Sequence, residues 1–313
     1  MNYMPFEYGR FYMTTLLHDA TRELHGSEGY TPSSAFPASE LLYADDTLIV
    51  DVNAQNAERF MTAIASAGLN YGLAFNWKKL EVLPVRCVAS IPTPDGSEVP
   101  QKSSIVYLGS LLHGDGNIGS ELGRRLGAAQ SDFKSLCRVW GRSTVSRQRK
   151  LTIFSACVIS KLLYCLHTAW LNTAERRRLD AFQARCLRTI CGVQHSFISR
   201  VTNETVRDMA GCKPLSSILL ERQLVLFADI ARRPFADPLR KCVFEGSSML
   251  LRSQSGRRKQ GRPRNTWATS VCQEAVAAAG GRAQLNILLA SSSAADWKAL
   301  ARKHCSRVIN HLE

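Results

Sequence analysis

Residues 36 to 52 read FPASELLYADDTLIVDV and place two adjacent aspartates, Asp45 and Asp46, between two short apolar runs. The runs ELLY and TLIVDV have strand character, so they predict a β-hairpin with the aspartates at its tip. The connection is not the Asn-Gly or Asp-Gly pair that favours a tight hairpin turn. Something other than turn propensity must therefore explain the two acids.

Two neighbouring carboxylates repel each other, and a bound cation would relieve that repulsion. Hard carboxylate oxygens on a rigid turn suit Mg²⁺, which favours one or two carboxylates together with substrate phosphates. The alternative for an arbitrary pair of aspartates is a solvated polar turn. Asp45 and Asp46 are therefore candidate metal ligands.

The segments around this hairpin predict a small α+β region. Residues 11–26 have the apolar spacing of a short helix. Residues 53–68 predict an amphipathic helix with Asn53 as its cap and Gly68 at its end. Residues 73–85 return to strand character, and residues 105–116 predict a further strand pair closed by glycines. The order β, α, β, β predicts one sheet with a helix on one face.

From about residue 118 the pattern changes to long helices with apolar stripes and basic outer faces. A basic stretch rich in Gly and Ser follows at 253–267, and a last helix is predicted over 296–309. The fold class is α+β, divided into 1–37 (helix and loop), 38–113 (sheet), 114–243 (helices) and 244–313 (basic linker and terminal helix). The three stripes are Ile118, Leu122, Leu126, Ala129, Phe133, Leu136 and Trp140; Leu151, Phe154, Val158, Ile159, Leu162 and Leu163; and Leu179, Phe182, Cys186, Leu187 and Ile190.

The net charge of +14 is unevenly distributed along the chain. Residues 1–85 carry 5 Lys and Arg against 10 Asp and Glu, whereas residues 86–313 carry 35 against 16. Such an excess of cations fits a polyanionic partner, because Lys and Arg neutralise phosphates and release counterions. A solvated basic surface is the alternative.

The ten cysteines are scattered without the regular spacing of a disulfide framework, and the first residues lack a secretory leader. We therefore expect free thiols in an intracellular compartment, either nucleus or cytoplasm. The most apolar stretch is interrupted by Lys161 and His167 and is too short for a membrane helix, so no membrane partner is expected. Cys186, Cys191 and His195 offer a weak zinc alternative that lacks a fourth ligand.

The motif YADD at Tyr43–Asp46 resembles the metal-binding hairpin of reverse transcriptases in the form used by non-LTR (LINE-type) retrotransposons. The order of features continues downstream. The segment GLAFNWKKLEVL carries Gly72, Asn76 and Lys79 at the family's characteristic positions, and YLGSLL at 107–112 resembles its primer grip. HGDGNIGSELGRRLGAA resembles the start of its thumb, and GRPRNTW and DWKAL resemble its carboxy-terminal region.

The resemblance implies the carboxy-terminal part of a polymerase palm followed by a helical thumb-like region. Asp45 would be the principal Mg²⁺ ligand and Asp46 its more peripheral partner, in a family that uses two metal ions for nucleotidyl transfer. Lys79 would lie near the incoming nucleotide and act as general acid to the leaving pyrophosphate. The partner implied is an RNA or DNA template-primer. The residues implied to contact it are Tyr107, Leu108 and Gly109 in the primer-holding turn, and Arg124 and Arg125 on the basic helices.

The family takes a further aspartate from a separate upstream strand, and no such strand motif is found before the hairpin. Asp19, for example, falls in a predicted helix. We therefore expect an RNA-directed DNA polymerase fragment that is inactive alone. One alternative is an enzyme completed in trans by another chain that carries the missing half. Another is a non-enzymatic nucleic-acid-binding module derived from a retroelement. The other acids available are Glu7, Glu23, Glu28 and Glu40.

Overall fold

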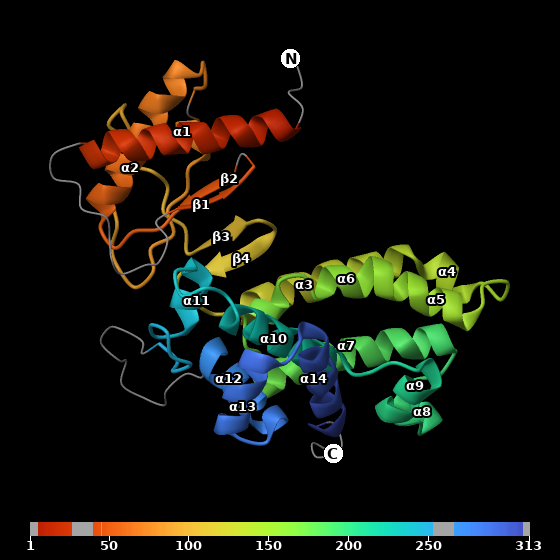
Figure 1. The fold of residues 1–313 in the computed structure, drawn as a ribbon. Helices are drawn as coiled ribbons and strands as arrows, with labels where there is room; N and C mark the ends of the chain where they lie inside the picture. Colours follow the sequence, from red (N-terminus) through yellow and green to blue (C-terminus); the bar gives the residue numbers. More distant parts are fainter. Residues whose placement is uncertain (1–5, 27–39, 45, 75, 253–265, 309–313) are drawn as a thin grey trace. The chain divides into compact units, whose positions relative to one another are not determined.

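A computed structural model describes residues 6–26, 40–44, 46–74, 76–252 and 266–308, and of residues 6–12, 307 and 308 it describes the backbone alone. The chain divides into two compact units, residues 1–117 and 118–313, each with its own core (Figure 1). The first unit is α+β and the second is helical. The four finer ranges expected from the sequence stay predictions.

Two helices form the core of the first unit, α1 (Phe6–Gly26) and α2 (Ala54–Asn70). They pack through small and branched apolar side chains such as Ala20 and Ile64, both buried. The predicted cap is confirmed, because the Asn53 side chain accepts a hydrogen bond from the backbone N–H of Gln55 at 2.9 Å. The helix continues two residues past its predicted end at Gly68, to Asn70.

Both predicted strand pairs form, but they do not join into one sheet. The hairpin of β1 (Glu40–Tyr43) and β2 (Asp46–Ile49) and the hairpin of β3 (Ser104–Tyr107) and β4 (Ser110–His113) are separate two-stranded antiparallel sheets. The predicted strand over 73–85 is wrong: its described part holds a 3₁₀ turn, η1 (Trp77–Lys79), and one isolated bridge.

The physical reason lies in the segment that links the two hairpins. It contains Pro84, Pro92, Pro94 and Pro100, which lack the N–H that a central strand needs. The segment therefore pairs only through isolated bridges, Val82 with Gln101 and Pro92 with Glu98. A helix on one face of a single sheet is thus replaced by a helix pair with two small hairpins.

The second unit begins with helices packed around one apolar cluster. The three predicted stripes are confirmed as core, with Leu122, Leu163 and Phe182 almost fully buried. The Trp140 ring stacks on Phe133 at 5.0 Å. The helices here are α3 (Gly119–Ser135), α4 (Cys137–Gly141), α5 (Arg147–Phe154), the π-helical turn η2 (Ser155–Ile159), α6 (Ser160–Leu162), the 3₁₀ turn η3 (Leu166–Thr168), α7 (Thr173–Cys191), α8 (Ser196–Ser199) and α9 (Asn203–Ala210).

A second cluster completes this unit around α10 (Leu215–Ala231). Leu219 belongs to the first cluster and Leu220 to the second, so the start of this helix packs in the first cluster and the rest of it in the second. The predicted last helix is confirmed as α14, where the buried Trp297 indole donates to the carbonyl of Leu224 at 2.9 Å. The remaining helices are α11 (Pro238–Val243), α12 (Trp267–Ala279), α13 (Arg282–Ser291) and α14 (Ala294–Val308).

Within the described ranges, every helix is too short or too polar to cross a lipid bilayer. The basic stretch 253–265 lies outside the described residues.

Candidate functional site

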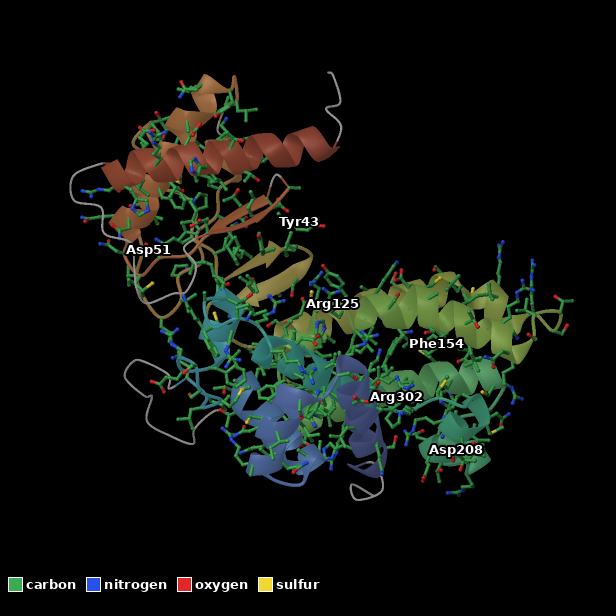
Figure 2. The ribbon with its side chains drawn as sticks, viewed as in Figure 1. Tyr43, Asp51, Arg125, Phe154, Asp208 and Arg302 are labelled. Atoms are coloured by element: carbon green, nitrogen blue, oxygen red, sulfur yellow. The ribbon has the colours of Figure 1, made fainter. Side chains whose placement is uncertain are left out.

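The first hairpin closes in a very tight turn. Its register pairs Tyr43 with Asp46, so the loop consists of Ala44 and Asp45. Ala44 has φ +54°, the left-handed conformation that the first position of a type I′ turn requires. Asp46 is exposed at the start of β2, and Tyr43, 59% exposed, ends β1 (Figure 2). Asp45 lies outside the described residues.

The second hairpin also closes through a two-residue loop. Tyr107 pairs with Ser110, and the loop residues Leu108 and Gly109 have φ +48° and +74°. Two positive φ values in a two-residue loop define a type I′ turn, in which a leucine is strained. The three residues implied to grip the primer thus share one tight turn.

Tyr107 joins the second hairpin to the first. Its hydroxyl donates to the backbone carbonyl of Leu41 in β1 at 3.1 Å. Burial and the negative charge of Asp46 both raise the pKa of Tyr107. The structure therefore brings together two predicted site residues, Asp46 and Tyr107, that are far apart in the sequence.

Lys79 lies on the 3₁₀ turn η1 with its side chain exposed. The turn is anchored because Trp77 and Leu80 pack against the small cluster that contains Met61. Among the contacts described in the structure, none joins Lys79 to Asp46 or to the Tyr107 turn. The implied role of this lysine stays a prediction.

One candidate for a further acid, Asp19, is already engaged by a hydrogen bond. Asp19 lies on α1, as the sequence predicts, and accepts a hydrogen bond from the Tyr71 hydroxyl at 2.5 Å. Asp46 is a hard oxygen donor of the kind Mg²⁺ takes. However, the residues that the structure describes place no three His, Cys, Asp or Glu side chains together as metal ligands. The described residues therefore do not make up a two-metal centre.

The zinc alternative fails on geometry. Cys186 is buried on the core face of α7, and burial raises its pKa to about 12. Cys186, Cys191 and His195 all lie in the described part of the chain, which places no three His, Cys, Asp or Glu side chains together as metal ligands.

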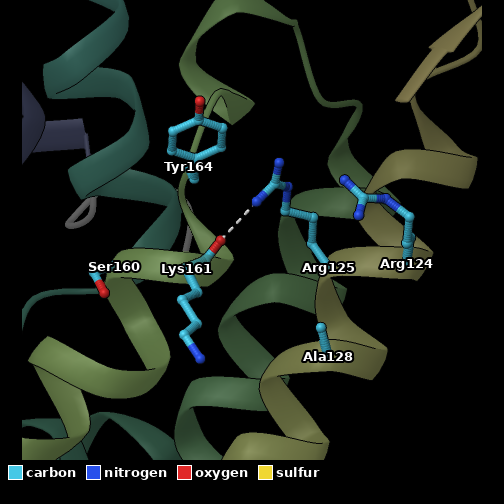
Figure 3. Close-up of a pocket in the computed structure, with 6 residues that line it drawn as sticks. All are labelled: Arg124, Arg125, Ala128, Ser160, Lys161 and Tyr164. Carbon is cyan, nitrogen blue, oxygen red and sulfur yellow. Dashed lines mark hydrogen bonds between the residues drawn. The ribbon is translucent and has the colours of Figure 1, made fainter. Parts of the chain in front are cut away.

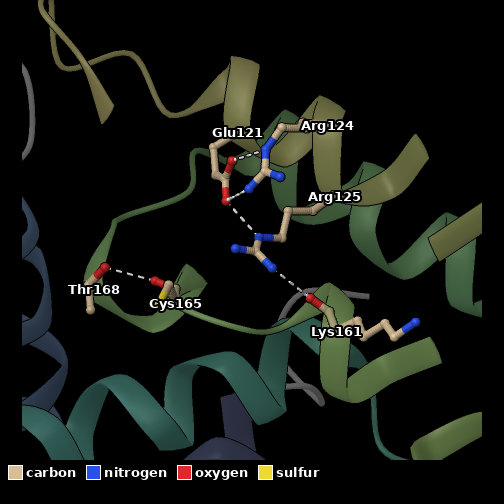
Figure 4. Close-up of polar contacts among 6 residues, drawn as sticks. All are labelled: Glu121, Arg124, Arg125, Lys161, Cys165 and Thr168. Atoms are coloured by element: carbon tan, nitrogen blue, oxygen red, sulfur yellow. Dashed lines mark hydrogen bonds and ion pairs between the residues drawn. The ribbon is translucent and has the colours of Figure 1, made fainter. Parts of the chain in front are cut away.

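The two arginines implied to contact nucleic acid lie in the second unit and share one carboxylate. Glu121, in the first turn of α3, is 1% exposed. Arg124 donates to it through Nε at 2.7 Å and Nη2 at 2.9 Å, and Arg125 through Nε at 2.6 Å (Figure 4). Arg125 also donates to the backbone carbonyl of Lys161 at 3.0 Å and so connects α3 to α6.

The charges of this cluster are unequal. Burial by itself raises the pKa of Glu121, but the hydrogen bonds and charges of Arg124 and Arg125 outweigh burial and lower it. The carboxylate is therefore ionised at neutral pH, and one negative charge faces two guanidiniums. The Arg124 side chain is 41% exposed and that of Arg125 is 10% exposed. The excess positive charge is thus presented to solvent mainly at Arg124.

An open pocket of about 430 Å³ lies beside these arginines (Figure 3). The Arg125 guanidinium lies 4.9 Å from the centre of the Tyr164 ring, in cation–π geometry. Sequence reasoning missed the residues opposite the arginines, although Ser160 and Tyr164 are four residues apart, a spacing that places two side chains on one helical face. The pocket is lined by Arg124, Arg125, Ala128, Ser160, Lys161 and Tyr164.

No family model, curated protein or solved structure matches the chain.

Proposed function

We propose that this chain is a partial reverse transcriptase of the non-LTR type, which binds nucleic acid but does not polymerise DNA by itself. The observation that carries the proposal is the hydrogen bond from the Tyr107 hydroxyl to the backbone carbonyl of Leu41. Tyr107 is also close enough to Asp46 for that negative charge to raise its pKa. It puts the YADD hairpin and the YLG turn next to each other, as a primer end beside a metal-binding hairpin would require.

The proposed lack of activity rests on the acids. Two-metal phosphoryl transfer needs carboxylates that bridge both ions, so that the attacking and leaving oxygens are stabilised together. The Asp19 carboxylate accepts a hydrogen bond from the Tyr71 hydroxyl. The described residues contain no group of three side chains that could together bind a metal ion. No catalytic step is therefore assigned to this chain alone.

The proposed binding rests on charge. Residues 86–313 carry the whole positive excess of the chain, and they include the Arg124 and Arg125 cluster. A protein that neutralises phosphates with such side chains binds more weakly as salt rises, because released counterions drive the association. We expect the chain to bind an RNA template annealed to a DNA primer, with affinity that falls steeply with salt.

The test combines two assays on the purified full chain. Fluorescence anisotropy with a labelled primer-template should show salt-dependent binding that survives the double substitution Asp45→Asn and Asp46→Asn. Primer extension with Mg²⁺ should show no incorporation. Polyglutamate, a polyanion without phosphates or bases, serves as the matched competitor.

Each part of the proposal has its own contrary result. Mg²⁺-dependent incorporation that disappears in Asp45→Ala would overturn the proposed lack of activity. No binding, or equal displacement by polyglutamate at matched charge, would overturn nucleic-acid recognition and leave only a solvated basic surface.

A further inference from the structure

We infer that the pocket beside α3 and α6 holds one nucleotide of single-stranded RNA or DNA, with its base on the Tyr164 ring and its phosphate at Arg124. The inference rests on the proposed nucleic-acid binding. It goes further because it names the form of nucleic acid and the residue that reads its unpaired state.

Tyr164 provides the platform for a base. The ring is 48% exposed, and it is held by the Arg125 guanidinium 4.9 Å from its centre. Bases of a single strand stack on such rings with little regard to sequence, because every base has a π face. In a duplex the bases are already paired and stacked, so they cannot reach the ring. The exposed ring therefore favours a single strand.

The cations are arranged before any ligand arrives. Glu121 accepts hydrogen bonds from both guanidiniums, which fixes their planes and reduces the entropy lost when a phosphate binds. Figure 3 shows Arg124 and Arg125 on one segment and Tyr164 on the facing one. The Lys161 ammonium points away from the guanidiniums and is paired with Asp132 at 3.0 Å. A phosphate in the pocket would therefore meet the exposed guanidinium of Arg124.

Two backbone irregularities flank the segment from Ser160 to Tyr164, which holds α6 and the turn after it. The π-helical turn η2 ends immediately before Ser160, and Cys165 directly after Tyr164 has φ +59°. The Thr168 hydroxyl donates to the Cys165 carbonyl at 2.7 Å and holds this conformation (Figure 4). Both π-turns and left-handed non-glycine residues are concentrated at functional sites, where the surrounding structure maintains the strain. Here they lie directly before and after the segment that carries Tyr164.

The volume agrees with a single nucleotide. A pocket of about 430 Å³ is at the lower end of the range for small-ligand sites. It has room for one base and its phosphate, whereas a duplex could touch only its rim.

The experiment measures anisotropy of a short labelled RNA strand, of its blunt duplex and of the same strand with one abasic position. Tyr164→Leu should weaken single-strand binding about fivefold or more, the lower end of the effect of losing one stacked base. Tyr164→Phe should bind as the unmodified chain does. Phe197→Leu, at an exposed ring on α8, is the matched control and should have no effect.

The affinity for the blunt duplex should be the same for Tyr164→Leu, Tyr164→Phe and Phe197→Leu as for the unmodified chain. Arg124→Gln keeps the bond from Arg125 to Glu121, and it should reduce the slope of log affinity against log salt by about 0.7 for the single strand. If Tyr164→Leu does not fold, the unmodified chain still decides the question, because it should bind the abasic strand more weakly than the intact one.

Two results overturn the inference: Tyr164→Leu binding the single strand as tightly as the unmodified chain, or the intact and abasic strands binding equally. If the unmodified chain binds primer-template and either result is found, this inference alone fails. If it binds no nucleic acid of any form, the proposed function fails as well.

Discussion

Two tight turns in the first unit hold a side chain where glycine is the ordinary choice. Ala44 and Leu108 each occupy the first position of a two-residue hairpin loop, with φ +54° and +48°. A left-handed conformation costs an L-residue about 1–2 kcal/mol. These are the two turns that carry the predicted metal-binding and primer-holding residues, so the strain falls where the proposed function needs a defined backbone.

Ala44→Gly should therefore stabilise the first unit by about 0.5–1 kcal/mol, because the relief of strain exceeds the added entropy of the unfolded chain. The measurement is denaturant-dependent hydrogen exchange of the α2 amides. Ala65→Gly, in the middle of α2, is the matched control and should destabilise by about 1 kcal/mol. If Ala44→Gly lowers the stability as Ala65→Gly does, Ala44 is not strained.

At the scale of elements, one buried carboxylate holds a helix in place. Glu121 of α3 binds Arg125, and Arg125 binds the Lys161 carbonyl of α6, so an ion pair within one helix also fixes its neighbour. Removing one partner of a buried ion pair leaves the other charges uncompensated, which is more costly than removing a surface pair. The sequence pattern predicts both arginines on a basic outer face, whereas the Arg125 side chain is mostly buried.

Glu121→Gln should lower the free energy of unfolding by about 2–3 kcal/mol at neutral pH, less than for a fully buried pair because Arg124 is partly exposed. The folded-state pKa of Glu121 lies below its ordinary value of 4.5. Its contribution is therefore complete above that value and is lost as the pH falls through the lowered folded-state pKa.

Urea unfolding at several pH values should show the gap between Glu121→Gln and the unmodified chain narrowing in acid. Glu245→Gln, at an exposed glutamate of the same unit, is the control and should change stability little. A gap that stays constant down to strongly acidic pH would contradict the lowered pKa.

At the scale of the molecule, the second unit has its own apolar core. Its two apolar clusters meet along α10, which contributes neighbouring residues Leu219 and Leu220 to one cluster each. Buried polar groups on the same helix are satisfied, since Gln223 donates to the Ala169 carbonyl at 2.6 Å and Ser217 to that of Cys305 at 3.2 Å. The inferred nucleotide pocket lies wholly within this unit.

Residues 118–313 produced alone should therefore unfold in one cooperative thermal transition and should keep single-strand binding that depends on Tyr164. Calorimetry and the anisotropy assay check the two statements separately. A broad, non-cooperative transition would show that the clusters need residues 1–117. Binding that no longer responds to Tyr164→Leu would contradict the location of the site.

Local pattern by itself predicted the helices over 11–26, 53–68 and 296–309, the three apolar stripes between 118 and 190, both hairpins and the Asn53 cap, because helical periodicity, strand propensity and capping act over a few residues. It did not predict the helices α8 to α13. Even the pairing of Glu121 with Arg124 and Arg125 follows from their spacing of three and four residues on one helix. Only the tertiary structure decided that the hairpins stay separate, that Tyr107 meets Leu41 and that Arg125 meets Tyr164. These contacts join residues far apart in the chain. They depend on how apolar faces pack and on which carboxylate is buried, and a short window of sequence does not contain that information.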